Sequence, residues 1–158
     1  MTAAEVARRL KAQRAVIVTA ESCTGGWVAQ ELTAIAGSSA WFDRGFVTYS
    51  NEAKQEMLGV RAETLRKHGA VSEETAREMA QGALERSRGS VSLAITGIAG
   101  PSGGTPDKPI GTVCFAWATK QGATRAETKH FPGDREAVRR QSVEYSLAGV
   151  LPLLDEAG

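Results

Sequence analysis

The sequence predicts an α/β fold, a three-layer α/β/α sandwich in which a mixed, mostly parallel sheet carries helices on both faces. Short apolar, β-branched segments alternate along the chain with amphipathic segments of helical period, the order typical of this class. Three of the strand segments run directly into polar or glycine-rich turns, which is where α/β proteins place their ligands. Since the chain has 158 residues and no long linker, we expect residues 1–158 to form a single domain.

The first half of the chain is predicted to contain two strands and four helices. Residues 15–20 are apolar and largely β-branched, which favours a buried strand, and the aromatic segment 41–49 favours a second, interrupted by a bulge or turn at 43–45. Apolar residues recur at helical spacing in 2–13 and 27–35. Ser50 and Asn51 are typical of a helix cap before 52–58, and a short helix follows at 62–67.

The second half is predicted to contain three strands and two longer helices. Ser72 is a suitable N-cap, with acidic residues in the first turn, for a helix over 76–87. Strand 90–96 leads into a loop rich in glycine and proline, and strands 111–119 and 123–131 form an antiparallel pair. Asp134 caps a last helix over 135–154, which Pro152 is able to end early.

Composition excludes several classes of protein. The net charge is +1 and the basic residues are scattered, so we expect a small neutral or anionic ligand and no nucleic acid. No apolar run is long enough to span a membrane and the first ten residues do not form a signal peptide, so we expect a cytoplasmic protein. Cys23 and Cys114, with only His68 and His130, lack the spacing of a zinc site, and we predict no metal, no cofactor and reduced thiols.

The turn after strand 15–20 is the first candidate site. Ser22 is a candidate nucleophile, because N–H groups at a helix start can hold a ligand anion or a developing oxyanion beside its hydroxyl. Thr24, Gly25 and Gly26 are the candidate donors there. A capping serine is the alternative, and Cys23 is a rival nucleophile. Glu21 is placed in the site to orient either the turn or the base.

A base for the serine is predicted at the second strand end. His68 and His130 are poorly placed in the sequence, so a triad with histidine is not expected. Lys54 can accept the serine proton if it is partly desolvated, and Tyr49 can relay that proton or bind the oxyanion. A solvated lysine and a core tyrosine are the alternatives.

The third strand end is a candidate binding loop. Thr96, Gly97, Gly100 and Gly103 are placed to hold a phosphate or ribose, although glycines also serve simply as turn residues. At the start of the last helix, Arg135 is a candidate phosphate ligand. Arg139 and Arg140 are further candidates, and arginines on a helix commonly form only a solvated face.

Four blocks of sequence, covering nearly the whole chain, resemble the CinA C-terminal domain family, the nicotinamide-nucleotide amidases. The blocks are Thr19-Ala20-Glu21-Ser22-Cys23-Thr24-Gly25-Gly26, Val47-Thr48-Tyr49-Ser50-Asn51 through Lys54, Gly69-Ala70-Val71-Ser72, and Thr96-Gly97-Ile98-Ala99-Gly100-Pro101 with Lys108-Pro109-Ile110-Gly111-Thr112-Val113. The resemblance implies the stand-alone form of the domain and hydrolysis of nicotinamide mononucleotide to nicotinate mononucleotide and ammonia. It also implies a serine–lysine–tyrosine arrangement formed by Ser22, Lys54 and Tyr49.

The glycine loops and the aromatic residues support two further expectations. The same glycine loops can bind a pyridine nucleotide without reacting, so a non-catalytic sensing module is the alternative function. The aromatic residues Trp41 and Phe42 are candidates for an exposed surface, so we expect a homo-oligomer.

Overall fold

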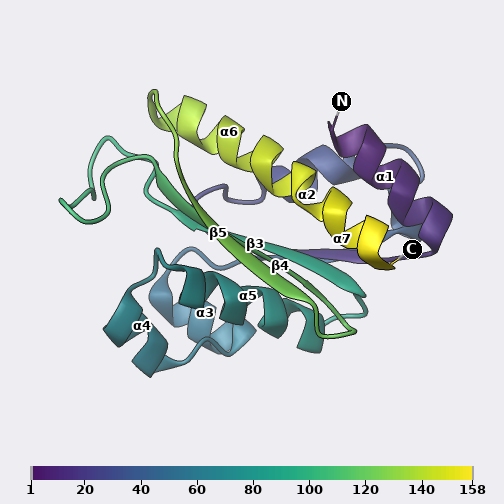
Figure 1. Ribbon diagram of the computed structural model, residues 1–158, viewed down its shortest axis with the longest axis horizontal. Helices are drawn as coiled ribbons and strands as arrows, with labels where there is room; N and C mark the ends of the chain where they lie inside the picture. The colour runs from purple at the N-terminus through teal and green to yellow at the C-terminus, as the bar shows by residue number, and fades with distance from the viewer. Residues whose placement is uncertain (1, 158) are drawn as a thin grey trace.

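A five-stranded sheet separates two layers of helices (Figure 1). The computed structural model describes residues 2–157, with side chains described as far as residue 155. The strands are β1 (Ile17–Glu21), β2 (Phe42–Val47), β3 (Val91–Gly97), β4 (Thr112–Thr119) and β5 (Thr124–His130), in the spatial order β2-β1-β3-β4-β5. β1 is parallel to β2 and β3, and β4 is antiparallel to β3 and β5. Four strands therefore run in one direction, which confirms the mixed, mostly parallel sheet.

The helices divide between the two faces of the sheet as predicted. They are α1 (Thr2–Gln13), α2 (Trp27–Thr33), α3 (Asn51–Leu58), α4 (Ala62–His68), α5 (Glu73–Glu85), α6 (Arg135–Ala148) and α7 (Val150–Ala157), with a 3₁₀ turn at Ser38–Ala40. In Figure 1, α1, α2, α6 and α7 lie on one side of the sheet, and α3, α4 and α5 lie on the other. Each layer buries its own apolar cluster against the sheet.

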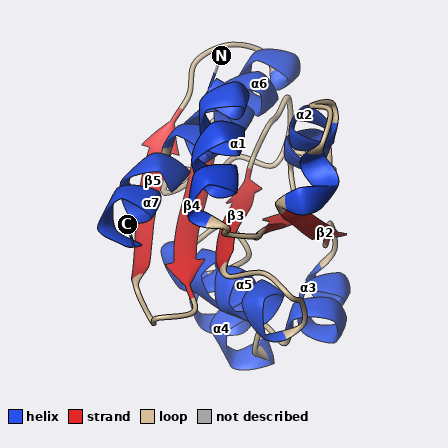
Figure 2. Ribbon diagram, turned by 90° about the vertical axis from the view of Figure 1, so that its right-hand side faces the viewer, coloured by secondary structure: helices blue, strands red, loops and turns tan. Residues whose placement is uncertain are grey.

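The parallel part of the sheet places three strand ends side by side. Figure 2 shows β2 at the end of the sheet away from β5. β1 lies between β2 and β3 and pairs in parallel with both, so the carboxyl ends of all three strands lie at the same edge. In such sheets ligands bind at this edge. The fold thereby brings together three turns that are far apart in the sequence: the one after Glu21, the one after Val47 and the one after Gly97.

Local sequence signals account for most element boundaries. Ser50, Ser72 and Asp134 each accept a hydrogen bond from the main-chain N–H three residues later, which confirms them as helix caps. The predicted interruption near residues 43–45 is a bulge, because Ile17 pairs with Phe42 while Val18 pairs with Arg44.

The last helix differs from the prediction. The structure has two helices, α6 and α7, in place of one helix over 135–154, and the break lies at Gly149, not at Pro152. Gly149 packs against the indole of Trp117 so closely that a Cβ atom would lie 2.1 Å from Cζ2. Pro152 lies in the first turn of α7, where a missing N–H does no harm.

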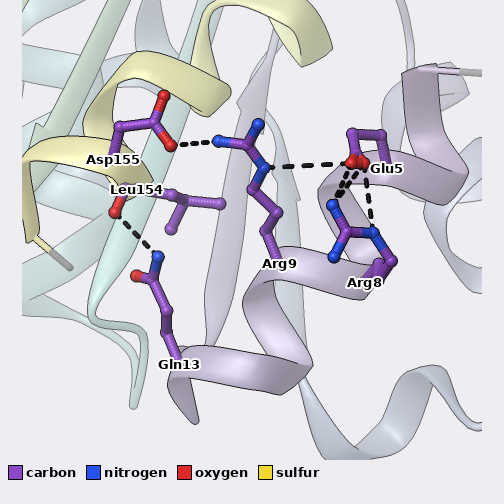
Figure 3. A network of polar contacts seen from close by, with 6 residues as sticks. All are labelled: Glu5, Arg8, Arg9, Gln13, Leu154 and Asp155. Carbon is purple, nitrogen blue, oxygen red and sulfur yellow. Dashed lines mark hydrogen bonds and ion pairs between the residues drawn. The ribbon is translucent and has the colours of Figure 1, made fainter.

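Contacts between the two ends of the chain join α1 to α7 (Figure 3). The guanidinium of Arg9 pairs with the carboxylate of Asp155, and Gln13 Nε2 donates to the main-chain oxygen of Leu154 at 2.8 Å. Arg9 also lies 3.9 Å from the carboxylate of Glu5 on its own helix. None of the described helices combines the length and the apolar character that crossing a membrane requires.

The basis for an oligomer changes with the structure. Trp41 is buried in the core and Phe42 is partly buried against it, so these two aromatics do not form the exposed surface expected from the sequence. The exposed large apolar side chains are Val47, Tyr49, Met57 and Ile110. A homo-oligomer therefore stays a prediction, and exposure of Trp41 and Phe42 no longer supports it.

Candidate active site

A cavity of about 210 Å³ opens at the carboxyl ends of β1, β2 and β3. It is lined by Ser22, Cys23, Tyr49, Asn51, Lys54, Ala70, Val71, Thr96, Gly97, Ala99 and Arg135. Larger cavities of about 330, 450 and 530 Å³ lie elsewhere, and none of these three is lined by Ser22, Lys54 or Tyr49. The predicted convergence of three strand ends on one crevice is therefore confirmed.

Ser22 and Lys54 meet at the bottom of this cavity. Ser22 follows β1 directly. Lys54 lies in the first turn of α3, the helix that begins after the Ser50 cap. Lys54 Nζ lies 3.1 Å from Ser22 Oγ and donates to the main-chain oxygens of Thr48 at 3.0 Å and Tyr49 at 3.2 Å. The lysine side chain is only 1% exposed, so the alternative of a solvated lysine is wrong.

Burial changes the acid–base behaviour of Lys54. Desolvation lowers the pKa of its amine from the ordinary value. Among residues 2–155, no carboxylate lies within ion-pair distance of the ammonium. A buried amine without an acidic partner releases its proton more readily than a surface lysine, so it is suited to act as a base.

Glu21 occupies the helix start that was expected to hold a ligand. Its carboxylate is fully buried, and Oε1 accepts from Thr24 Oγ1 at 2.7 Å and from the N–H groups of Gly26 at 3.2 Å and Val28 at 2.9 Å. Oε2 accepts from the N–H of Ala29 at 3.0 Å. The N-terminus of α2 is thus neutralised from within the chain. Glu21 does not line the cavity, and its contacts match the role of orienting the turn.

Of the three main-chain donors predicted in this turn, two already have acceptors. The N–H of Gly25 donates to the Ser22 oxygen at 3.1 Å, and that of Gly26 donates to Glu21. Within the described chain, the N–H of Thr24 has no acceptor, although the residue is fully buried. None of Thr24, Gly25 and Gly26 lines the cavity, so the predicted donors of this turn do not face the candidate site.

Tyr49 and Arg135 lie together at the mouth of the cavity. Tyr49 is 63% exposed, and its hydroxyl accepts from Arg135 Nη2 at 3.3 Å. Arg135 Nη1 donates to the Gly100 oxygen at 2.8 Å. The hydroxyl of Tyr49 contacts neither Lys54 nor Ser22 in the described structure, so the predicted proton relay through it has no hydrogen-bonded path. The alternative of a core tyrosine is also wrong.

The remaining predicted residues divide between the wall and the outside. Thr96 and Gly97 form one wall, where Thr96 Oγ1 donates to the Ala70 oxygen at 2.8 Å. Gly100 contributes through its carbonyl, which accepts from Arg135, and Gly103 is exposed in the loop away from the cavity. Only part of the predicted binding loop therefore faces the candidate site.

Cys23 lines the cavity but is a poor nucleophile. Burial raises the pKa of its thiol to about 12, so the thiolate is scarce at neutral pH. Cys23 and Cys114 are both free and buried. No group of three or more His, Cys, Asp or Glu residues in the described chain is arranged to hold a metal ion.

Sequence reasoning missed several residues around the site. Asn51, Ala70, Val71 and Ala99 line the cavity, and helical spacing of three residues from Lys54 was a usable signal for Asn51. Arg139 contacts the main chain of the Ser22 turn. From the sequence, Arg139 was predicted to be either a phosphate ligand or a solvated residue. Its contact with the turn was therefore not predicted.

Comparisons with known proteins agree with this architecture. The family model described as the CinA C-terminal domain matches residues 1–154. An Escherichia coli K12 protein named nicotinamide-nucleotide amidohydrolase PncC is 59% identical over 143 residues, 90% of this chain and 87% of that protein. A protein of the same name from Enterobacter agglomerans is 52% identical over 147 residues, 93% and 90% of the two chains. The crystal structure of a competence-damaged protein (CinA) superfamily member from Klebsiella pneumoniae superposes with a TM-score of 0.94 at 44% identity, covering 98% of this chain and 96% of that one.

Proposed function

Because the chain belongs to the CinA C-terminal domain family, we propose that it hydrolyses the carboxamide of nicotinamide mononucleotide to nicotinate mononucleotide and ammonia. The names of its relatives support this substrate. The observation that carries the proposal is the 3.1 Å contact between Lys54 Nζ and Ser22 Oγ inside a cavity at the sheet edge. A buried amine beside a serine hydroxyl is a base next to a nucleophile, as covalent amide hydrolysis requires.

The partners of Lys54 direct its lone pair toward the serine. Carbonyl oxygens only accept hydrogen bonds, so Thr48 and Tyr49 take two N–H groups of the amine. A neutral lysine amine has two N–H groups and one lone pair. Because the two N–H groups bind the carbonyl oxygens, the lone pair faces Ser22 Oγ. The serine hydroxyl donates its proton along that contact as Oγ attacks the carboxamide carbon. The lowered pKa of Lys54 favours this neutral starting state.

The same amine can complete the reaction. Protonated Lys54 donates to the amide nitrogen of the tetrahedral intermediate, the C–N bond breaks and ammonia leaves. A water molecule then gives a proton to Lys54 and attacks the ester carbon of the acyl-serine, and the proton returns to Ser22 Oγ as the C–O bond breaks. The products are the nucleotide carboxylic acid and ammonia, and one water molecule is consumed.

The cavity suits the reacting end of the substrate. Its volume of about 210 Å³ lies below the roughly 300–1,000 Å³ of sites that enclose a whole ligand. The nicotinamide group enters, and the ribose phosphate stays at the mouth, where the guanidinium of Arg135 supplies positive charge. The pyridinium ring is a cation, so a neutral Lys54 also lessens repulsion toward the bound ring.

Ammonia release tests the proposal directly. Purified protein, treated with a chelator and shown to be folded, is incubated with nicotinamide mononucleotide, and ammonia and nicotinate mononucleotide are measured. We expect turnover by the wild type, loss of turnover in Ser22→Ala and retention of most activity in Cys23→Ala. Absence of product from the folded wild-type protein would overturn the proposal.

Calorimetry separates the alternative function. Tight binding of the nucleotide by a wild-type protein that forms no product would indicate a pyridine-nucleotide sensing module. Sensitivity of turnover to the chelator would contradict the proposed metal-independent chemistry. We also propose that residues 1–158 act as a single domain, which predicts one cooperative unfolding transition in urea.

A further inference from the structure

The side chain of Arg139 holds the turn that carries Ser22. Arg139 comes from α6, and its Nε donates to the Cys23 oxygen at 3.0 Å while Nη2 donates to the Thr24 oxygen at 3.2 Å. Its guanidinium also lies 5.4 Å from the ring centroid of Trp27, the first residue of α2. The arginine therefore joins the C-terminal part of the chain to the two residues that follow the candidate nucleophile.

This contact fixes the direction of one peptide plane. The Cys23–Thr24 peptide is trans, so its C=O and N–H groups point in opposite directions. Because Arg139 binds the carbonyl of this peptide, the Thr24 N–H points away from Arg139. That N–H is the buried donor that has no acceptor in the described chain. Thr24 is fully buried and does not line the cavity, so the group that this brace holds in place at the cavity is the main chain that carries Ser22.

We propose that Arg139 is a positioning residue for catalysis, which holds the main chain directly after Ser22 so that Ser22 Oγ stays opposite Lys54 Nζ and in reach of the substrate carboxamide. The inference rests on the proposed function and deepens it. Arg139 does not line the cavity, so it acts through the turn and not on the substrate. Its effect is expected on the chemical step, because displacing a nucleophile by about 1 Å slows its attack while the contacts to the bound substrate remain.

The contact requires an arginine for a geometric reason. The planar guanidinium reaches two successive carbonyls at once, whereas a lysine ammonium is a point donor on a flexible stem. Glu21 holds the opposite side of the same turn, through the Thr24 hydroxyl and the N–H of Gly26. The turn is therefore clamped between a carboxylate that binds its donors and a guanidinium that binds its carbonyls.

The test compares variants of two adjacent arginines. Arg140, a further phosphate candidate from the sequence, does not line the cavity. It also lies over Trp27, at 5.9 Å from the ring centroid, but its guanidinium pairs with Glu136 and not with the turn. Arg139→Met, Arg139→Lys and the matched control Arg140→Met are assayed for kcat and KM with nicotinamide mononucleotide. Thermal unfolding of each variant is measured in parallel, and Arg139→Lys keeps the charge and stem in case Arg139→Met does not fold.

The expected result is a loss confined to the chemical step. We expect kcat to fall on the order of 10- to 100-fold in Arg139→Met, the loss that a displacement of about 1 Å in a reacting group can cause. KM and the midpoint of the pH profile should stay near the wild-type values, because the cavity and Lys54 are unchanged. Arg139→Lys should recover part of kcat, and Arg140→Met should match the wild type.

Two outcomes would overturn the inference, and they differ from failure of the proposed function. A folded Arg139→Met or Arg139→Lys protein with the kcat of the wild type would show that the turn needs no brace. A fall in kcat shared equally by Arg140→Met would show a general effect of charge or helix stability. If the wild type itself releases no ammonia, the proposed function fails and this inference fails with it.

Discussion

Lys54 reaches Ser22 from the end of the neighbouring strand, with 3.1 Å between Nζ and Oγ. Its other hydrogen-bond partners among the described residues are two main-chain oxygens, of Thr48 and Tyr49. The pair is thus isolated from acidic side chains. Its chemistry depends on how readily the buried amine loses a proton.

The activity should therefore rise with pH. Burial lowers the pKa of Lys54, and only the neutral amine can accept the serine proton, so kcat/KM increases as pH rises through that lowered pKa and then levels off. The midpoint should lie below the ordinary lysine value of about 10.4. Initial rates measured across a pH series give the profile.

Lys54→Arg is the companion variant for the pH series. Its guanidinium stays protonated throughout, so we expect kcat/KM to fall by about 10²- to 10⁴-fold, with no rise over the same range. A Lys54→Arg protein with wild-type rates, or a wild-type rate that declines as pH rises toward the midpoint, would be incompatible with a lysine base.

Thiol reagents should leave the activity intact. The pKa of Cys23 is raised to about 12 by burial, so iodoacetamide at pH 8 meets almost no thiolate, although the residue lines the cavity. Activity is followed during incubation with the reagent, alongside Cys23→Ala. Rapid inactivation of the wild type that is absent from Cys23→Ala would show an accessible, reactive thiol instead.

Glu21 should contribute to stability and to activity together. Glu21→Gln replaces one carboxylate oxygen with an NH₂ group that cannot accept, so at least one buried donor loses its partner. We expect a loss of about 1–3 kcal/mol in the free energy of unfolding, measured with urea, and a lower kcat. Glu52→Gln, which changes an exposed glutamate in the first turn of α3, is the control and should change neither. Equal stability of the two variants would contradict the capping role.

The break between α6 and α7 should be sensitive to one methyl group. In Gly149→Ala the new Cβ would lie 2.1 Å from Trp117 Cζ2, so one of the two must move. We expect a loss of about 1–3 kcal/mol in the free energy of unfolding. Trp117→Phe, alone and combined with Gly149→Ala, completes a double-mutant cycle. Strictly additive effects would show that the indole does not exclude the methyl group.

Much of the fold and half of the site follow from local sequence patterns. The strand segments, the caps at Ser50 and Ser72 and the bulge near Asp43 are properties of neighbouring residues, and each is confirmed. Ser22 and Lys54 were predicted to face each other because parallel strand ends meet at one edge, and they do.

The features that could not be predicted depend on contacts between distant parts of the chain. The last helix breaks at Gly149, where the indole of Trp117 leaves no room for a side chain, and the residues near 149 in the sequence do not predict that contact. The same holds for Arg139, which lies 116 residues from the carbonyl that it binds. Glu21 was placed at the correct turn, but only the structure shows which donors its carboxylate satisfies.

The hydrogen bonds from Arg139 to Cys23 and Thr24 also connect the Ser22 turn to a segment of the chain that is synthesised late. Ser22 and Lys54 leave the ribosome early, whereas Arg139 follows about a hundred residues after Ser22. The turn that carries Ser22 therefore receives this contact only after α6 has been synthesised and has packed on the sheet. A chain truncated before α6 would keep Ser22, Lys54 and the strands of the sheet but lack the arginine that holds the turn.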